Sequence, residues 1–325
     1  MSFINIISTA KALPKNEVTA SQIDTMCDFK DGYTEKLTGL QKRYFLKDET
    51  SSELMKEAID KALLEANMTI EDMDCIIAAF ATSQQAIPYN AAWVYNILKP
   101  KKNIATFDIN MTCLSALKAF EISSKLFDLY SNILIVTCDI ASVGLDWSDI
   151  KSAGIFGDGA SAMIVQKSQS GGILVSNFET YAQGFEFAQI KAGGTLYPMA
   201  QYSDEYEQFT KFKMNGKQIF KLSASILPSF VDRTLKSIDI SLDDIDYIVP
   251  HQASQTALNH IARILHFDKS KMVDIFKNHG NQVASSIPIA FHELLIRNVL
   301  KSGDKVMLLG TSAGLGLGLV VWEVP

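Results

Sequence analysis

The sequence predicts an α/β protein built from two similar halves. Short runs rich in β-branched residues alternate with longer amphipathic stretches along the 325 residues. In addition, residues 63–77 (LLEANMTIEDMDCII) resemble residues 235–249 (LKSIDISLDDIDYIV), which lie 172 residues later. Repetition at a fixed spacing indicates a duplicated structural unit.

Two further elements share this spacing. The amphipathic stretch that begins at Cys113 falls on residues 285–300, and residues 132–136 fall on residues 304–308. Three consecutive matches favour a duplicated strand-helix-strand unit over chance similarity. Two such units predict a pseudo-symmetric double sandwich of sheets, with any shared site between them.

We place the two halves at residues 1–170 and 171–325. The segment 180–215 fits neither repeat and is rich in aromatic residues and glycine. We interpret it as an insertion or lid. A surface loop with its own aromatic core is an equally good interpretation.

Individual elements follow from hydrophobic periodicity. Residues 51–67 have apolar residues at helical spacing, with Ser51 or Ser52 as the expected N-cap and acidic residues in the first turn. Residues 113–130 also predict a helix. The strands are expected where β-branched residues dominate, at residues 4–8, 75–81, 104–109 and 133–138.

Composition excludes several functional classes. Hydrophobic residues make up 47% of the chain and charged residues 20%, which is typical of a globular protein, and the formal net charge is −6. Basic clusters are absent from the sequence, so a nucleic-acid partner is not expected. The sequence shows no apolar run of about 20 residues and no signal-peptide pattern, so we predict a cytoplasmic protein without a membrane span.

The four cysteines are Cys27, Cys75, Cys113 and Cys138. Their spacing matches neither a metal site nor a disulfide framework, so each is expected to be a free thiol. Cys75 and Cys138 lie in apolar strand runs, and Cys27 suits helix packing. Cys113 lies between a strand and a helix, where the helix dipole favours a thiolate. Taken alone, core packing remains as good an interpretation of Cys113.

Two polar residues strengthen the functional interpretation. His251 follows directly after a predicted strand, at the edge where α/β sheets present functional groups. Asn281 lies in a turn before a helix that begins near Ala284, where a capping role is the alternative. The histidines at 260, 266 and 292 are better explained as surface or packing groups, and His279 lies two residues from Asn281.

Five motifs, in this order and spacing, resemble the β-ketoacyl-[acyl carrier protein] synthase III family. They are DINMTCLSAL, IFGDGASAMIV, VPHQAS, NHGNQVASSIPIA and a glycine-rich strand that begins GTSAGLGLG, and TGLQKR resembles an early family motif. The resemblance covers nearly the whole chain. It implies a thiolase fold, in which a duplicated unit forms a five-layered αβαβα sandwich, and it implies a homodimer.

The resemblance also implies the site. The catalytic triad is Cys113, His251 and Asn281, and the oxyanion hole uses the backbone N–H groups of Cys113 and of the 310–312 turn, at Thr311. Cys113 accepts an acyl group from a thioester, and a malonyl thioester then loses CO₂ and condenses with it. The implied partners are acyl-CoA, a malonyl thioester and acyl carrier protein, and no metal or other cofactor is implied. The residues expected to contact the carrier protein are Gln252, Ala253, Ser254, Gln255 and Thr256.

Some positions depart from the family pattern. Leu37 and Thr256 stand where many members have arginines that contact coenzyme A and the carrier protein, and Tyr33 stands where tryptophan is common. We therefore expect acetyl-CoA to be a poor primer and a longer or unusual acyl group to be preferred. Residues 85–98 and 180–215 are candidates for a roomier acyl channel, with ordinary packing as the alternative.

Two other functions were weighed. An enzyme with the same triad can transfer an acyl group to a hydroxyl or amine without decarboxylation, and the triad residues do not separate the two reactions. A non-catalytic paralogue that only pairs with an active partner is less consistent with an intact triad.

Overall fold

The computed structural model describes residues 3–325. Its larger sheet has five strands in the order β1-β7-β6-β4-β5. Strand β4 pairs in parallel with β5 and β6, whereas β7 is antiparallel to β1 and β6. These strands are β1 (Asn5–Ala12), β4 (Cys75–Ala78), β5 (Ala105–Asp108), β6 (Asn132–Asp139) and β7 (Gly159–Gln166).

The second sheet has four strands in the order β11-β12-β13-β8. They are β8 (Gly172–Thr180), β11 (Tyr247–Pro250), β12 (Lys305–Ser312) and β13 (Gly316–Glu323). Strand β11 is parallel to β12, and β13 is antiparallel to β12 and β8. The pattern of the first sheet is therefore repeated without β5. The division of the chain into folding units between residues 170 and 171 stays a prediction.

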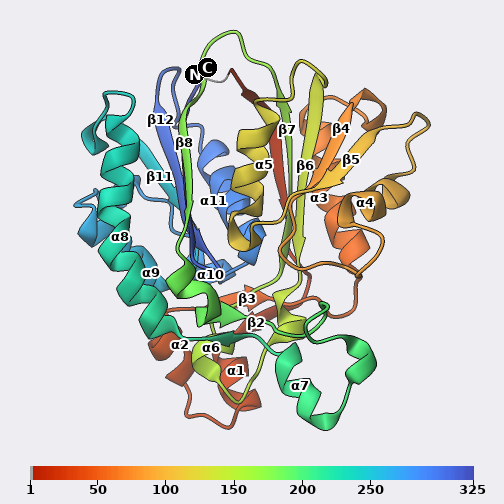
Figure 1. The fold of residues 1–325 in the computed structure, drawn as a ribbon, viewed down its shortest axis with the longest axis vertical. Helices are drawn as coiled ribbons and strands as arrows, with labels where there is room; N and C mark the ends of the chain where they lie inside the picture. The colour runs from red at the N-terminus through yellow and green to blue at the C-terminus, as the bar shows by residue number, and fades with distance from the viewer. Residues whose placement is uncertain (1–2) are drawn as a thin grey trace.

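Helices separate and cover the two sheets (Figure 1). Helices α5 (Ser115–Ser123) and α11 (Ser286–Leu295) lie between the sheets and share one apolar core with both. A second core joins the first sheet to α3 (Ser51–Glu65) and α4 (Asn90–Leu98). A third joins the other sheet to α8 (Gly216–Lys236) and α9 (Gln255–Ile264). The result is the five-layered αβαβα arrangement that was expected.

The predicted repeat has a direct structural counterpart. Strand β4 begins at Cys75 and β11 at Tyr247, which reproduces the spacing of 172 residues seen in the sequence. The residue after each strand makes the same backbone bond: Ala79 N–H donates to Val136 at 2.8 Å, and His251 N–H donates to Leu309 at 2.7 Å. The two sheets therefore bring equivalent strand ends to the same layer of the molecule.

The predicted strands all occur with shifted ends, but two helix predictions need correction. Helix α3 is capped by Thr50 rather than Ser51 or Ser52, because Thr50 forms a capping box with Glu53. The helix expected over residues 113–130 begins as a 3₁₀ turn and its α-helical part ends at Ser123. Hydroxyl groups of serines near this end donate to main-chain carbonyls, which competes with helix continuation.

The remaining elements are short and cover the ends of the sheets. Within residues 3–325, no helix combines the length and the apolar character needed to cross a bilayer. In this same range, His, Cys, Asp and Glu side chains form no group of three or more that could hold a metal ion. The short elements are β2 (Glu17–Thr19), α1 (Ala20–Met26), α2 (Tyr33–Thr38), β3 (Lys42–Tyr44), α6 (Ile150–Ala153), η4 (Ala182–Phe187), β9 (Ala188–Gln189), α7 (Asp204–Thr210), β10 (Lys213–Met214) and α10 (Phe276–His279).

Candidate active site

Cys113 lies in a tight turn that links the end of β5 to α5. The turn is the 3₁₀ helix η2 (Thr112–Leu114), and Thr112 has a φ of 50°, in the left-handed region that side chains rarely adopt. The side chain of Asn110 accepts a hydrogen bond from Thr112 N–H at 2.9 Å and closes the turn. A constrained backbone of this kind is a common feature of functional sites.

His251 is held at the end of β11. Its backbone is tied to Leu309 of the neighbouring strand, as noted above, and its side chain is 4% exposed. Gly310 makes this placement possible, because a Cβ atom there would lie 3.0 Å from the His251 Cβ and 2.9 Å from Leu114. Any larger residue at 310 would push His251 and the nucleophile turn away from β12.

Asn281 is fixed by contacts on both sides of its side-chain amide. Its Oδ1 accepts a hydrogen bond from Val283 N–H at 2.9 Å, and its Nδ2 donates to the Ala253 carbonyl at 3.5 Å. Because Oδ1 is occupied by a backbone donor, the Nδ2 group retains a second N–H for a ligand. The predicted turn and helix start are present, since η8 (Val283–Ser285) leads into α11.

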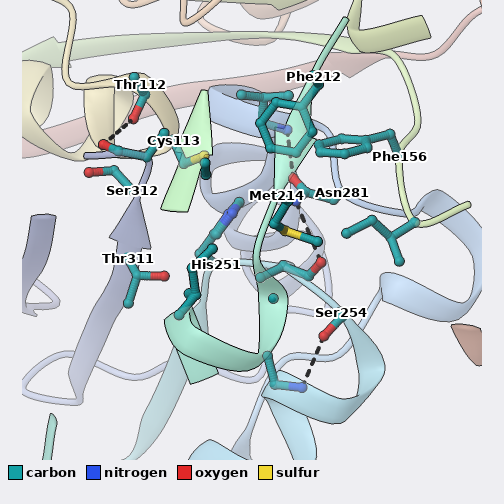
Figure 2. Close-up of a pocket in the computed structure, with 18 of the residues that line it drawn as sticks. Thr112, Cys113, Phe156, Phe212, Met214, His251, Ser254, Asn281, Thr311 and Ser312 are labelled. Carbon is teal, nitrogen blue, oxygen red and sulfur yellow. Dashed lines mark hydrogen bonds between the residues drawn. The ribbon is translucent and has the colours of Figure 1, made fainter. Parts of the chain in front are cut away.

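The three side chains converge on one cavity of about 1060 Å³. Figure 2 shows the His251 ring and the Asn281 amide turned toward the Cys113 sulfur, from three different segments of the chain. Thr112, Thr311 and Ser312 complete one side of this region. The structure thus brings the three residues predicted as a triad together, although their catalytic roles stay a prediction.

Burial of the Cys113 side chain changes the expectation for its ionisation. Desolvation, together with the negative charge of Asp139, raises the pKa of the Cys113 thiol to about 12. Hydrogen bonds from the backbone N–H groups of Ala313 and of Cys113 itself oppose this rise in pKa without overcoming it. The thiolate expected from the helix dipole is therefore wrong for the unliganded site, which holds a neutral thiol.

These same contacts revise the expected oxyanion hole. The N–H groups next to the sulfur belong to Cys113 and Ala313. Thr311, the donor expected from the sequence, lies within β12, where it pairs with Leu317. The tight turn between β12 and β13 brings Ala313, two residues further on, to the sulfur instead.

His251 is neutral in this environment. Burial lowers the pKa of His251 to about 4, well below its usual value of 6.5. Its Nδ1 is buried and has no hydrogen-bond partner among the described residues. A neutral imidazole next to a neutral thiol is able to accept the thiol proton when an acyl group is transferred.

The other histidines divide into two groups. His279 lies outside the cavity, where it contacts Lys11 Nζ at 3.2 Å, so its proximity to Asn281 in sequence has no counterpart in the site. His292 bonds to Thr9 on another surface. His260 was expected to be a surface or packing residue, but it lines the cavity and stacks on Phe220 with ring centroids 4.2 Å apart.

The segment expected to contact a carrier protein is only partly accessible. Gln252 is fully buried, and its side chain ties the backbone of Pro250, Val273 and Ile275 together, so a direct carrier contact at Gln252 is wrong. Thr256 is exposed and lies at the wall of the cavity. It faces the same opening as Leu37 of α2, since Gly39 packs against Gln255.

Segment 182–215 covers one side of the cavity, whereas residues 85–98 contribute none of the described lining residues. The proposed role of 85–98 in an acyl channel is therefore wrong, because α4 lies on the outer face of the first sheet. The lid segment combines both interpretations given above. Tyr197, Tyr206 and Phe209 form its small aromatic core, while Ile190 and Leu196 line the cavity.

One functional feature was not found from the sequence. Asp139 ends β6 as a fully buried carboxylate that accepts hydrogen bonds from Ala81 N–H and Thr82 N–H, each at 2.9 Å. Burial raises the pKa of Asp139 to about 6. The sequence gives no signal for this role, since TCDI reads as an ordinary strand end and the contact with the 81–82 loop depends on tertiary structure.

Taken together, the five-layered sandwich and a buried thiol beside histidine and asparagine define a thiolase-fold condensing enzyme. Family profiles agree with this class: 3-oxoacyl-[acyl-carrier-protein (ACP)] synthase III matches residues 107–184 and its C-terminal domain matches residues 235–324. The chain is 30% identical to the β-ketoacyl-[acyl-carrier-protein] synthase III of Clostridium acetobutylicum, over 99% of this chain and 98% of that protein.

Solved structures show the same fold. The 3-oxoacyl-[acyl-carrier-protein] synthase III of Aquifex aeolicus has a TM-score of 0.87 and 28% identity, and covers 98% of this chain and 99% of its own. A further 3-oxoacyl-(acyl-carrier-protein) synthase III structure has a TM-score of 0.90 at 23% identity, with 99% of both chains covered. The chain therefore belongs to the 3-oxoacyl-[acyl-carrier-protein] synthase III family.

Proposed function

We propose that this enzyme condenses an acyl thioester with a malonyl thioester through an acyl group carried on Cys113. The observation that carries this proposal is the convergence of the Cys113 thiol, two N–H donors, His251 and Asn281 on a single cavity. Family membership supports it, because condensation is the reaction named for the relatives.

In the loading step, the Cys113 sulfur attacks the thioester carbonyl carbon. The thiol proton passes to neutral His251 and then to the sulfur of the departing thiol. The oxygen of the tetrahedral intermediate is held by the N–H groups of Cys113 and Ala313, which already lie at the sulfur. This step forms one C–S bond and breaks another, and leaves His251 neutral.

In the decarboxylation step, the malonyl thioester loses CO₂ and its electron pair moves onto the thioester oxygen. An N–H of the His251 imidazole and the free N–H of Asn281 donate hydrogen bonds to this developing enolate. Each such donor contributes about a hundredfold or more to the rate. A neutral imidazole suits this role, and burial keeps His251 neutral.

In the condensation step, the enolate carbon attacks the acyl carbonyl on Cys113. A C–C bond forms, the C–S bond breaks, and Cys113 regains a proton from solvent. The product is a β-ketoacyl thioester. No metal or redox group takes part in these three steps, and the proposed substrates are thioesters on coenzyme A or on acyl carrier protein.

Intact-protein mass spectrometry tests the proposal. Incubation with acyl thioesters should add the acyl mass, peptide mapping should place it on Cys113, and malonyl thioester should then remove it with release of CO₂. Release of the acyl group to a hydroxyl or amine acceptor, without malonyl thioester, would instead identify an acyltransferase. An adduct on Cys27, Cys75 or Cys138 would contradict the assignment.

We further propose a homodimer that forms along β5. This strand is the open edge of the first sheet, and its side chains are half-buried. Open edges readily pair with a second chain. A monomeric mass at micromolar concentration, or a dimer unaffected by Thr106→Pro, would exclude this interface. We also propose a cytoplasmic location, where thiols stay reduced.

A further inference from the structure

The cavity extends between helices α8 and α9, in a region that the proposed steps do not use. We call this region the α8–α9 cleft. Its lining residues recur every three or four positions along each helix, so the two facing sides of the helices form its walls. Apart from two residues discussed below, the walls are apolar, and they include Ile219, Ala224 and Leu227 on α8 and Ala257, Ile261 and Ile264 on α9.

Ser223 is the first polar residue of this cleft. Its Oγ is buried, and no hydrogen-bond partner for it is found among the described residues. Two other serines of the same helix differ from it: Ser225 donates to the Leu222 carbonyl at 2.8 Å, and Ser229 donates to a carbonyl at 3.0 Å. Only the serine that faces the cleft thus has an unsatisfied hydroxyl among these three.

His260 is the second. Its Nδ1 lies 2.9 Å from Nη2 of Arg263, and a guanidinium only donates, so Nδ1 must be the acceptor. The ring is kept neutral because burial and the Arg263 charge lower the pKa of His260. The remaining proton therefore sits on Nε2, which is buried and unpartnered within the described part of the chain. Stacking on Phe220 fixes the ring plane.

We propose that the α8–α9 cleft binds the substrate's acyl chain at a point where that chain carries a keto or hydroxyl oxygen. Such an oxygen accepts hydrogen bonds from Ser223 Oγ–H and His260 Nε2–H, and the apolar walls hold the hydrocarbon on either side. Leaving buried donors unpaired is costly, so a chain without the oxygen binds less well. The inference rests on the proposed condensation and names its acyl substrate class.

The position of the donors along the helix indicates where this oxygen lies. Ser254 caps α9 next to Ala253, whose carbonyl bonds to Asn281. His260 is six residues further on, about 9 Å along the helix axis. The oxygen therefore sits well along the chain and not beside the thioester.

The pantetheine arm of the donor is the competing source of an oxygen. It carries two amide groups, each with a donor and an acceptor that need partners. The cleft offers two donors among isoleucine, leucine and alanine side chains, which matches a hydrocarbon with one oxygen better than it matches an arm with two amides.

The test measures the rate of Cys113 loading, by mass spectrometry, with dodecanoyl thioesters that do or do not carry one mid-chain keto or hydroxyl group. The wild-type enzyme should prefer an oxygen-bearing chain by about tenfold or more. Ser223→Ala and His260→Phe should remove most of this preference and leave the plain chain nearly unaffected. Ser225→Ala is the matched control, because its hydroxyl is satisfied within the helix, and it should keep the full preference.

Each thioester is also offered as its N-acetylcysteamine derivative, which lacks most of the pantetheine arm. If Ser223→Ala slows all pantetheine thioesters alike, and this effect disappears with the short derivatives, the hydroxyl contacts the arm and the proposal is overturned. A wild-type enzyme that loads plain and oxygen-bearing chains equally well also overturns it. Absence of loading on Cys113 with every thioester refutes the condensation function itself, and this proposal with it.

Discussion

The turns at residues 110–115 and 281–286 occupy equivalent positions in the two halves and have almost the same backbone. In the first, Asn110 accepts a hydrogen bond from Thr112 N–H at 2.9 Å, and Thr112 has a φ of 50°. In the second, Asn281 accepts one from Val283 N–H at 2.9 Å, and Val283 has a φ of 52°. One local structure, used twice, thus supports both sides of the site.

The side chains presented by the two turns differ. The residue after the strained position is Cys113 in the first half and Ala284, fully buried, in the second. Conversely, Asn281 is buried at the cavity, whereas its counterpart Asn110 is exposed. The duplicated backbone therefore supplies a nucleophile from one half and a hydrogen-bond donor from the other.

Cys113→Ala makes the first turn carry the same residue as the second and should have the largest effect. Condensation should fall by about 10⁴-fold or more, because the covalent step is lost. Loading is measured by intact mass and condensation by product formation. Cys75→Ala, in a buried strand, is the control and should retain both activities. Residual acyl loading in Cys113→Ala would show that the nucleophile lies elsewhere.

Asn281→Ala and Asn110→Ala remove the same turn hydrogen bond from opposite halves. Each should lower the free energy of unfolding by about 1 kcal/mol. Only Asn281→Ala should slow malonyl decarboxylation, by about a hundredfold or more, relative to acyl loading. The ratio of CO₂ release to loading separates the roles. Equal ratios in the two variants would mean that Asn281 acts only as a turn residue.

The pH dependence of decarboxylation tests the neutral state of His251. Because burial lowers the pKa of His251 to about 4, the imidazole stays neutral as the pH falls from 7 to 5, and the His251 contribution should persist. A histidine with its usual pKa would lose roughly thirtyfold over that range. The comparison uses enzyme already loaded on Cys113, so that the ionisation of the thiol does not enter. An acid limb near 6.5 that disappears in His251→Ala would contradict the neutral assignment.

Asp139→Asn tests why the thiol of the first turn is neutral. Asp139 is charged above its pKa of about 6 and raises the pKa of Cys113. Removing this charge should increase the rate of Cys113 alkylation by iodoacetamide at pH 8 by about three- to tenfold. Asp158→Asn is the control, since the charge of Asp158 acts on Cys138. No change in Asp139→Asn, with native circular dichroism, would assign the raised pKa to burial alone.

Much of the fold was predictable because it depends on local patterns. The strands, the spacing of 172 residues and the helix starts follow from periodicity and capping residues, although Thr50 shows that the spacing to Glu53 decides which residue caps. The triad followed from a family resemblance. The ionisation of Cys113, the burial of Gln252 and the position of His260 did not, because each depends on segments distant in sequence. The equivalence of Asn110 and Asn281 was present in the sequence but has a spacing of 171, one residue from the repeat that was found.

The smallest expected effect concerns the mouth of the cavity, where each half contributes one uncharged residue. Leu37 of α2 and Thr256 of α9 both line this opening, and arginines at these positions would restore the family pattern. Leu37→Arg should improve kcat/KM for coenzyme A thioesters by about two- to fivefold, since an exposed cation over an aromatic base contributes roughly 0.5–1 kcal/mol. Thr256→Arg should instead speed association with acyl carrier protein, an effect that disappears at high salt. Kinetics with acetyl, medium-chain and long-chain groups on each carrier separate these contributions from acyl preference. If acetyl-CoA is already the best donor of the unmodified enzyme, Leu37 and Thr256 are tolerated substitutions and the preference for longer acyl groups is wrong.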